Sequence, residues 1–184
     1  MTLTDGKISL RALEPGDIDL MFSWENDTTI WNDGATIAPF SRNLIADYIS
    51  GYEPDIFKAR QLRLMIDLID KDKALTIGTI DLYDFDPRNR RCGIGILIDT
   101  IHRGNGYATR AINITARYCA IHLGIHQLYA IAGVNNHPSY QAFQQAAFKI
   151  AGRLRSWIRI SSQSYTDAFI LQRLLAADTV SLND

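Results

Sequence analysis

The stretch of sequence that decides the fold is IGILIDTIHRGNGYA, residues 94–108. Its first five residues, 94–98, are apolar or glycine and have the character of a β-strand. A loop containing Gly104 and Gly106 follows, and a helix is expected to begin near Tyr107. Glycines let the backbone approach a ligand closely. The start of a helix also presents unpaired N–H groups and a partial positive charge. The stretch therefore predicts a binding site for a pyrophosphate.

Two common phosphate-binding motifs do not match this loop. A P-loop requires Gly-Lys-Ser/Thr, and the chain contains no such triplet. A dinucleotide fingerprint requires a third glycine three residues after Gly106, where this chain has Thr109. The pattern that remains is Arg-Gly-x-Gly-x-Ala, from Arg103 to Ala108. Taken alone it is also compatible with an ordinary tight turn before a helix, so the order of the surrounding elements has to decide.

Composition narrows the class of protein. The chain has 184 residues, 47% hydrophobic and 21% charged, which fits one globular domain covering 1–184. A net charge of −1 argues against a nucleic-acid partner. No apolar run reaches 18 residues and the first residues lack a signal sequence, so we expect no membrane association. Cys92 and Cys119 form no C-x-x-C pair, and two free thiols favour a cytoplasmic protein.

The remaining pattern alternates between strands and helices. Leu62, Leu64 and Ile66, for example, alternate as in a strand with one buried face. Strands are predicted at 7–13, 61–69, 75–85, 91–98, 128–134, 153–160 and 168–174, and helices from Asp17, from Ser41, at 107–123 and at 138–148. The resulting order is β-α-α-β-β-β-α-β-α-β-β.

This order and the loop together resemble the GNAT superfamily, the acetyl-CoA-dependent N-acetyltransferases, whose motif A is Gln/Arg-x-x-Gly-x-Gly/Ala. The resemblance extends from Lys7 to about Leu175 and is closest to the branch with spermidine and ribosomal-protein alanine N-acetyltransferases. That branch shares the segments Ile8-x-Leu10-Arg11, Trp24-x-Asn26-Asp27, Ile77-Gly78-x-Ile80 and Arg90-Arg91. A second motif, Asn136-x-x-Ser139-x-x-x-Phe143, resembles motif B of the family.

The resemblance implies an α/β fold with a mixed, mostly antiparallel and twisted seven-stranded sheet, flanked by about four helices. The fourth and fifth strands would splay into a V-shaped slot, where the pantetheine of acetyl-CoA would lie and no metal would be required. The implied cofactor-binding residues are Ile96, Leu97, Ile98, Arg103, Gly104, Asn105, Gly106, Tyr107, Ala108, Thr109, Asn136, Ser139 and Phe143.

The proton acceptor is a point where the chain departs from its relatives. Many of them carry a glutamate where this chain has Gly93. The nearest carboxylates are Asp81 and Asp84, and strict alternation along a strand would place them on opposite faces. We predict Asp81 as the proton acceptor because it follows the apolar run 77–80. A solvated charge beside a turn is the alternative for this residue.

The proton donor is a second departure. Many relatives place a tyrosine, which protonates the departing thiolate, where this chain has Phe143. Tyr140, one helical turn earlier, is the predicted replacement. The alternative is an aromatic side chain that only packs on the helix. A CoA thiolate also leaves without an acid, since a thiol pKa is about 8.5.

The acceptor is expected beside the segment 24–33. Trp24, Glu25, Trp31 and Asp33 combine aromatic faces with carboxylates, which suits a cationic amine. The alternative is that the tryptophans anchor the helices to the sheet. We therefore expect direct acetyl transfer to a small primary amine, with polyamines first and a protein N-terminus second. A CoA-binding sensor without activity, and a homo-oligomer, are left open.

Overall fold

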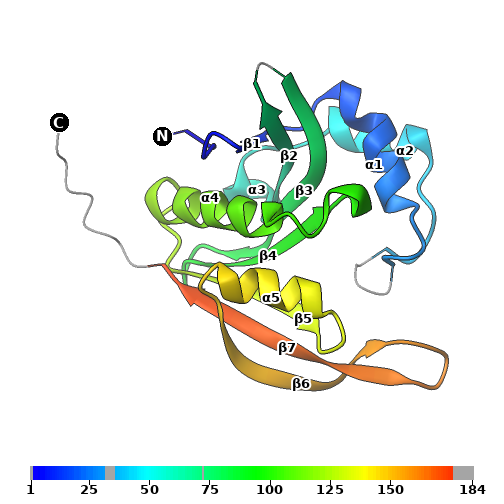
Figure 1. The fold of residues 1–184 in the computed structure, drawn as a ribbon, viewed down its shortest axis with the longest axis vertical. Coiled ribbons are helices and arrows are strands. Elements are labelled where there is room, and N and C mark those ends of the chain that lie inside the picture. Colours follow the sequence, from blue (N-terminus) through cyan, green and yellow to red (C-terminus); the bar gives the residue numbers. More distant parts are fainter. Residues whose placement is uncertain (1, 32–35, 72, 176–184) are drawn as a thin grey trace.

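The computed structural model describes residues 2–31, 36–71 and 73–175 (Figure 1). Its strands are β1 (Ile8–Arg11), β2 (Leu62–Asp70), β3 (Lys73–Asp86), β4 (Arg91–Ile98), β5 (Gln127–Gly133), β6 (Lys149–Arg159) and β7 (Tyr165–Leu174). Its helices are α1 (Ile18–Glu25), α2 (Arg42–Ser50), α3 (Ile56–Ala59), α4 (Tyr107–Ile121) and α5 (His137–Gln145), with 3-10 turns η1 (Pro15–Asp17) and η2 (Thr100–His102).

The strands form a seven-stranded sheet in the order β1-β2-β3-β4-β5-β7-β6. Neighbouring strands run antiparallel, except that β4 and β5 are parallel. This parallel pairing ends at Gly93 and Tyr129, although β4 continues to Ile98 and β5 to Gly133. The two strands therefore diverge, and the predicted slot between the fourth and fifth strands is confirmed.

Helices cover the sheet on both faces. On one face, α4 contacts β1 and β4, and α5 contacts β5 and β7. Figure 1 shows α4 lying across the strands and α5 beside β5. The larger core lies between these two helices and the sheet. On the opposite face, a second core packs α1 and α2 against β2 through Met21, Trp24, Ile45 and Met65, with Leu97 of β4 beside it. The central strands are thus buried from both sides.

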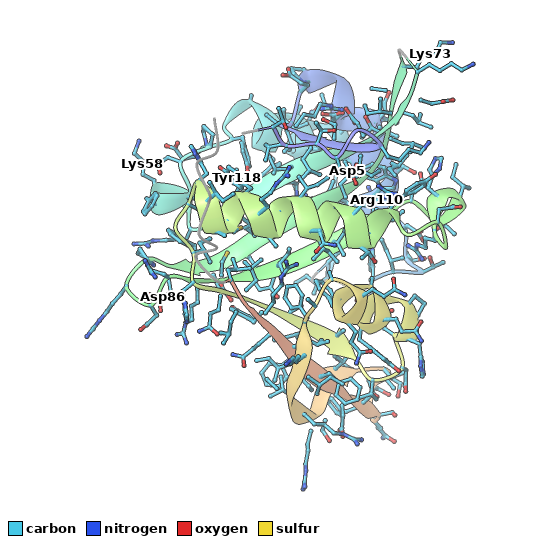
Figure 2. All side chains as sticks on the ribbon, turned by 60° about the vertical axis from the view of Figure 1, so that its left-hand side comes forward. Asp5, Lys58, Lys73, Asp86, Arg110 and Tyr118 are labelled. Atoms are coloured by element: carbon cyan, nitrogen blue, oxygen red, sulfur yellow. The ribbon has the colours of Figure 1, made fainter. Side chains whose placement is uncertain are left out.

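An ion pair and hydrogen bonds also connect helix α4 to the N-terminal residues 2–5. Arg110 forms an ion pair of 2.7 Å with Asp5, and the two side chains lie together in Figure 2. Arg117, two turns later, donates to the carbonyls of Thr2 and Thr4. These contacts hold the loop-to-helix junction in a fixed position beside β4.

Several element bounds differ from the sequence prediction, since β6 begins at Lys149 and not at 153, and β7 begins at Tyr165 and not at 168. Two further differences concern helices. The single-turn helix α3 was not predicted, because four residues are too short to show a helical period; Asp55 caps it by accepting from the N–H of Phe57. The predicted helix 138–148 ends at Gln145 instead. Ala147 adopts a positive φ of 63°, which stops the helix and lets β6 begin at Lys149.

Candidate active site

The glycine loop before α4 is shaped to bind an anion. Gly104 and Gly106 have φ of +78° and +73°, a region that side chains disfavour. The Asn105 amide donates to the carbonyls of His102 and Arg103, which holds the turn from inside. Within the described part of the chain, no acceptor is bonded to the N–H groups of residues 105–109. Residues Asn105 to Thr109 thus present unpaired donors at a helix start, which suits a diphosphate, whereas the N–H of Arg103 donates to the Thr100 carbonyl at 3.3 Å.

The open edge of β4 leads directly to this loop. The N–H of Asp99 donates to the Ile77 carbonyl on β3 at 2.8 Å. Because main-chain groups alternate between the two edges of a strand, those of Ile94, Ile96 and Ile98 face the slot. The Ile98 carbonyl accepts a hydrogen bond from Arg103 Nε at 2.8 Å. The groups of Ile94 and Ile96 remain available to an extended chain such as pantetheine.

Four more predicted cofactor residues lie on α5, just before it, or against the second core. Asn136 caps α5, since its side chain accepts from the N–H of Ser139 at 3.1 Å. Phe143 is 3% exposed and packs edge-on against Phe148. Leu97 directs its side chain into the second core. The cap fixes the start of α5 after β5, whereas the side chains of Phe143 and Leu97 pack in the two cores.

The predicted proton donor lies at the exposed beginning of α5. The Tyr140 hydroxyl is 2.8 Å from Nδ1 of His137, and its ring meets Phe169 of β7 edge-on. The side chain therefore bridges α5 and β7, and its role as a proton donor stays a prediction.

A half-buried arginine binds two of the carboxylates near the predicted site. Arg63 of β2 binds Asp81 through Nε at 2.6 Å and Nη2 at 3.2 Å, and it donates Nη1 to Glu25 at 3.0 Å. Burial opposes its charge, but the charge and hydrogen bonds of Asp81 outweigh this effect and raise the pKa of Arg63. The guanidinium also lies over the ring of Tyr48. Sequence reasoning missed Arg63, although a charge between Leu62 and Leu64 is a signal that could have revealed it.

Both tryptophans make structural contacts, and their role in binding an acceptor stays a prediction. Trp24 is 8% exposed in the second core and donates Nε1 to Asp99 at 3.2 Å. It also lines a small pocket of about 150 Å³ with Leu97 and Arg103. Trp31 donates Nε1 to the Glu25 carbonyl at 2.9 Å, which fixes the chain after α1. Asp33 lies outside the described residues.

The position of the missing glutamate is filled by a tyrosine ring. A Cβ on Gly93 would lie 2.3 Å from the Tyr83 ring, so Tyr83 requires a glycine there. Tyr83 meets Tyr129 edge-on, and the Tyr129 hydroxyl donates to Asp84 at 3.2 Å. Burial raises the pKa of Tyr83 to about 12. Neither tyrosine was singled out from the sequence, because tyrosines in strands are common.

The expectation that Asp81 and Asp84 lie on opposite faces of the sheet was wrong. The β3–β4 register shifts between Tyr83 and Asp86, and Asp84 has a positive φ of 50°. This β-bulge breaks the alternation of side chains. Asp84 consequently joins Tyr83 and Asp81 on the face that carries α1 and α2, where it meets Tyr129.

Comparison with known proteins places the chain in a family. The family described as "Acetyltransferase (GNAT) domain" matches residues 7–149, and the chain belongs to it. It is therefore an acyltransferase of a family that uses acetyl-CoA, as the resemblance implied. Among the described residues, no helix is long and apolar enough to cross a membrane.

The individual relatives share about a quarter of their residues with this chain. The chain is 25% identical over 150 residues to spermidine N(1)-acetyltransferase of Vibrio cholerae, which covers 82% of this chain and 83% of that protein. It is 24% identical over 156 residues to a prophage-derived uncharacterized N-acetyltransferase of Bacillus subtilis, covering 84% and 83%. The crystal structure of the V. cholerae enzyme with CoA and spermine matches at a TM-score of 0.81 and 22% identity, covering 94% and 98%. This likeness confirms the fold.

Proposed function

We propose that the protein transfers the acetyl group of acetyl-CoA directly to a small primary amine, with polyamines as the first candidates. The observation that carries the cofactor assignment is the row of unpaired N–H groups at residues 105–109, at the end of the open β4 edge. When bound there, acetyl-CoA supplies a thioester whose carbonyl carbon an amine can attack. The donors of the loop would hold the diphosphate, and the N–H groups of Ile94 and Ile96 would hold the pantetheine.

The charges on the α1–α2 face support a cationic acceptor. Glu25 and Asp81 bind one guanidinium between them, so their shared net charge is −1. Two further carboxylates, Asp84 and Asp86, follow along the same face. Tyrosine rings beside these groups suit a cation as well. The named V. cholerae relatives act on spermidine or bind spermine, which supports polyamines as the first class to test.

The bonds to Arg63 favour a binding role for Asp81. Both of its oxygens are engaged by the guanidinium, which fixes the carboxylate beside Gly95 on the neighbouring strand. A Cβ on Gly95 would meet only a Tyr83 ring carbon at 3.8 Å, so the approach over Gly95 is open. An ammonium group arriving there would lie between Asp81 and the two tyrosines.

The test is thiol release from acetyl-CoA with spermidine, spermine and an alanine-initiated peptide, with products identified by mass spectrometry. We expect acetylated polyamine, with kcat/KM at least about tenfold above that for the peptide. A preference for the peptide would assign the protein N-terminus as acceptor. Tight CoA binding with no turnover would favour the sensor, for which Gly93 and Phe143 are the sequence signals.

Two broader proposals accompany this function. We propose that residues 1–184 form one N-acetyltransferase domain, because β6 and β7, largely outside the matched range 7–149, complete the sheet against β5. We also propose a cytoplasmic location, which is supported by two buried thiols, Cys92 and Cys119, that form no disulfide.

A further inference from the structure

Tyr129 and Asp84 form a hydrogen-bonded pair at the closed end of the slot. Tyr129 is the last residue of β5 that pairs with β4, so its side chain stands where the two strands part. Its hydroxyl donates to Oδ2 of Asp84 at 3.2 Å. Because the acyl end of an extended pantetheine would point toward this closed end, the pair lies beside the reacting groups.

The surroundings leave the Asp84 carboxylate as the available base. Arg63 engages both oxygens of Asp81, and Asp86 is bound by Asn89 and by Arg91 at 3.3 Å. Among the described residues, Asp84 has no cation within 4 Å, and its hydrogen-bond donor is Tyr129. The carboxylate is exposed, so it can exchange a proton with water.

The neighbouring glycines give the Tyr129 hydroxyl access to an acceptor. Gly93 and Gly95 carry no side chain on this face, and the Tyr83 ring closes the space above Gly93 while leaving Gly95 open. An amine held by Asp81 over Gly95 therefore faces the two tyrosines. A pocket of about 390 Å³ lies beyond Tyr129, lined also by Asp84, Asp86, Arg91, Gln127 and Gln172. This pocket gives Asp84 a path to solvent.

We propose that Tyr129 and Asp84 together remove the proton from the incoming ammonium group, in place of the glutamate that many relatives carry at the position of Gly93. The inference rests on the proposed function. The ammonium N–H bond breaks as its proton passes to Tyr129 Oη, while the Tyr129 proton passes to the Asp84 carboxylate. The products are a neutral amine, an unchanged phenol and a carboxylic acid. Asp84 then returns its proton to water.

The electrostatics agree with a relay through a neutral phenol. Burial, followed by the charge of Asp84, raises the pKa of Tyr129, with Tyr83 and Cys92 acting in the same direction. Tyr129 therefore keeps its proton at neutral pH and passes one proton for each that it receives. Arg91 is the cation that lines the pocket, and its bond to Asp86 offsets its charge.

The experiment compares Tyr129→Phe and Asp84→Asn with the wild type, using spermidine and acetyl-CoA from pH 6 to 10. General base catalysis is typically worth about 10²-fold or more, so we expect kcat at pH 7 to fall about 100-fold in both variants. The deficit should shrink as pH rises, because an alkyl amine with a pKa of about 10.4 becomes neutral in solution. A weakly basic amine, already neutral at pH 7, should be acetylated by the variants and the wild type at similar rates.

The matched control is Asp70→Asn, which removes an exposed carboxylate at the β2–β3 hairpin, at the opposite end of β3 from Asp84. It should keep wild-type kcat. Asparagine tolerates the positive φ of residue 84, and phenylalanine keeps the ring at 129, so both variants should fold; thermal unfolding checks this.

Wild-type kcat in either variant would overturn the relay while leaving the proposed function intact. An equal loss at every pH and with the weakly basic amine would also overturn it, since that marks a structural defect. A wild type that acetylates no amine would overturn the proposed function and, with it, this role.

Discussion

At the scale of single residues, the Tyr83 ring packs directly against Gly93, so the residue types at these two positions depend on each other. The Tyr83 ring occupies the volume that any side chain at position 93 would need, with 2.3 Å between its nearest carbon and a Cβ there. The absence of the family glutamate is therefore coupled to a tyrosine ten residues earlier, on the adjacent strand. The substitution at 93 cannot be understood from position 93 alone.

Restoring the glutamate should consequently fail unless Tyr83 is also changed. Gly93→Glu forces the ring aside, and overpacking of this kind costs roughly 1–3 kcal/mol. The double variant Gly93→Glu/Tyr83→Ala should recover most of that loss. Chemical denaturation of the two single variants and the double variant measures the coupling. Additive losses would contradict the close packing described here.

Asp81 is expected to contribute mainly to binding the amine acceptor, with little effect on the chemical step. Asp81→Asn removes one of the two carboxylates that Arg63 binds, which leaves more positive charge on the acceptor face. We predict that KM for spermidine rises about tenfold while kcat stays within about threefold. Initial-rate kinetics at pH 8 separate the two constants. A large fall in kcat with an unchanged KM would instead support the proton-acceptor role predicted from the sequence.

The buried thiols should be inert in the folded protein. Burial raises the pKa of Cys92 to about 12 and that of Cys119 well above its usual value. Both thiols thus stay protonated at pH 8, and only the thiolate form is reactive. Iodoacetamide at pH 8 should leave both unmodified by mass spectrometry and leave activity intact. In denaturant both should react, because the unfolded thiols ionise near pH 8.5.

At the scale of elements, the site depends on where β4 parts from β5. The pairing stops at Gly93 and Tyr129, and this leaves the edge of β4 from Ile94 onward without a neighbouring strand. The chain then turns through two positive-φ glycines into α4. An unpaired strand edge and an unpaired helix start therefore lie at the two ends of the segment 99–104, within the described part of the chain.

A single methyl group in the glycine loop should weaken cofactor binding. Gly106→Ala has room for the Cβ, but its φ of +73° disfavours any side chain by about 1–2 kcal/mol. The loop is expected to relax away from the donor geometry, and KM for acetyl-CoA should rise at least about fivefold. Gly16→Ala is the matched control: it too has open space around the Cβ, without a positive φ. An equal effect of both substitutions on KM would count against the loop.

Much of this element-level description could be predicted from the sequence. The motif 103–108 and the order of elements carry the resemblance to the GNAT superfamily, and that resemblance implied the sheet, the splay and the cofactor loop. The bulge at Tyr83–Asp86 could not be predicted, since one extra residue in a strand leaves no periodic signal. The same bulge decides which carboxylates share a face, so the proposed catalytic groups were the part that sequence reasoning placed least well.

At the scale of the whole molecule, two cores support the site from opposite sides. The larger core fixes α4 and α5 on one face of the sheet, and the second fixes α1 and α2 on the other. The cofactor loop belongs to the first face, and the carboxylates that would receive the amine belong to the second. The gap between β4 and β5 connects the two faces, so a thioester bound from the first face could meet an amine bound on the second.

Cofactor binding should stabilise the whole fold. A ligand at 100 times its Kd adds about 2.7 kcal/mol, which for a chain of this size corresponds to a rise in Tm of about 5–10 °C. Differential scanning fluorimetry with CoA measures this shift. Pantetheine, which lacks the diphosphate, should give a much smaller rise at equal concentration. Equal shifts from both compounds would mean that the loop contributes little.

The central claim is that the main-chain donors of residues 105–109 hold the diphosphate of CoA. A crystal structure of the protein with CoA tests it most directly. The account predicts diphosphate oxygens within about 3.2 Å of several of these nitrogens, with pantetheine along Ile94 and Ile96 of β4. A diphosphate bound elsewhere, with the loop donors bonded to water or to the protein, would contradict it.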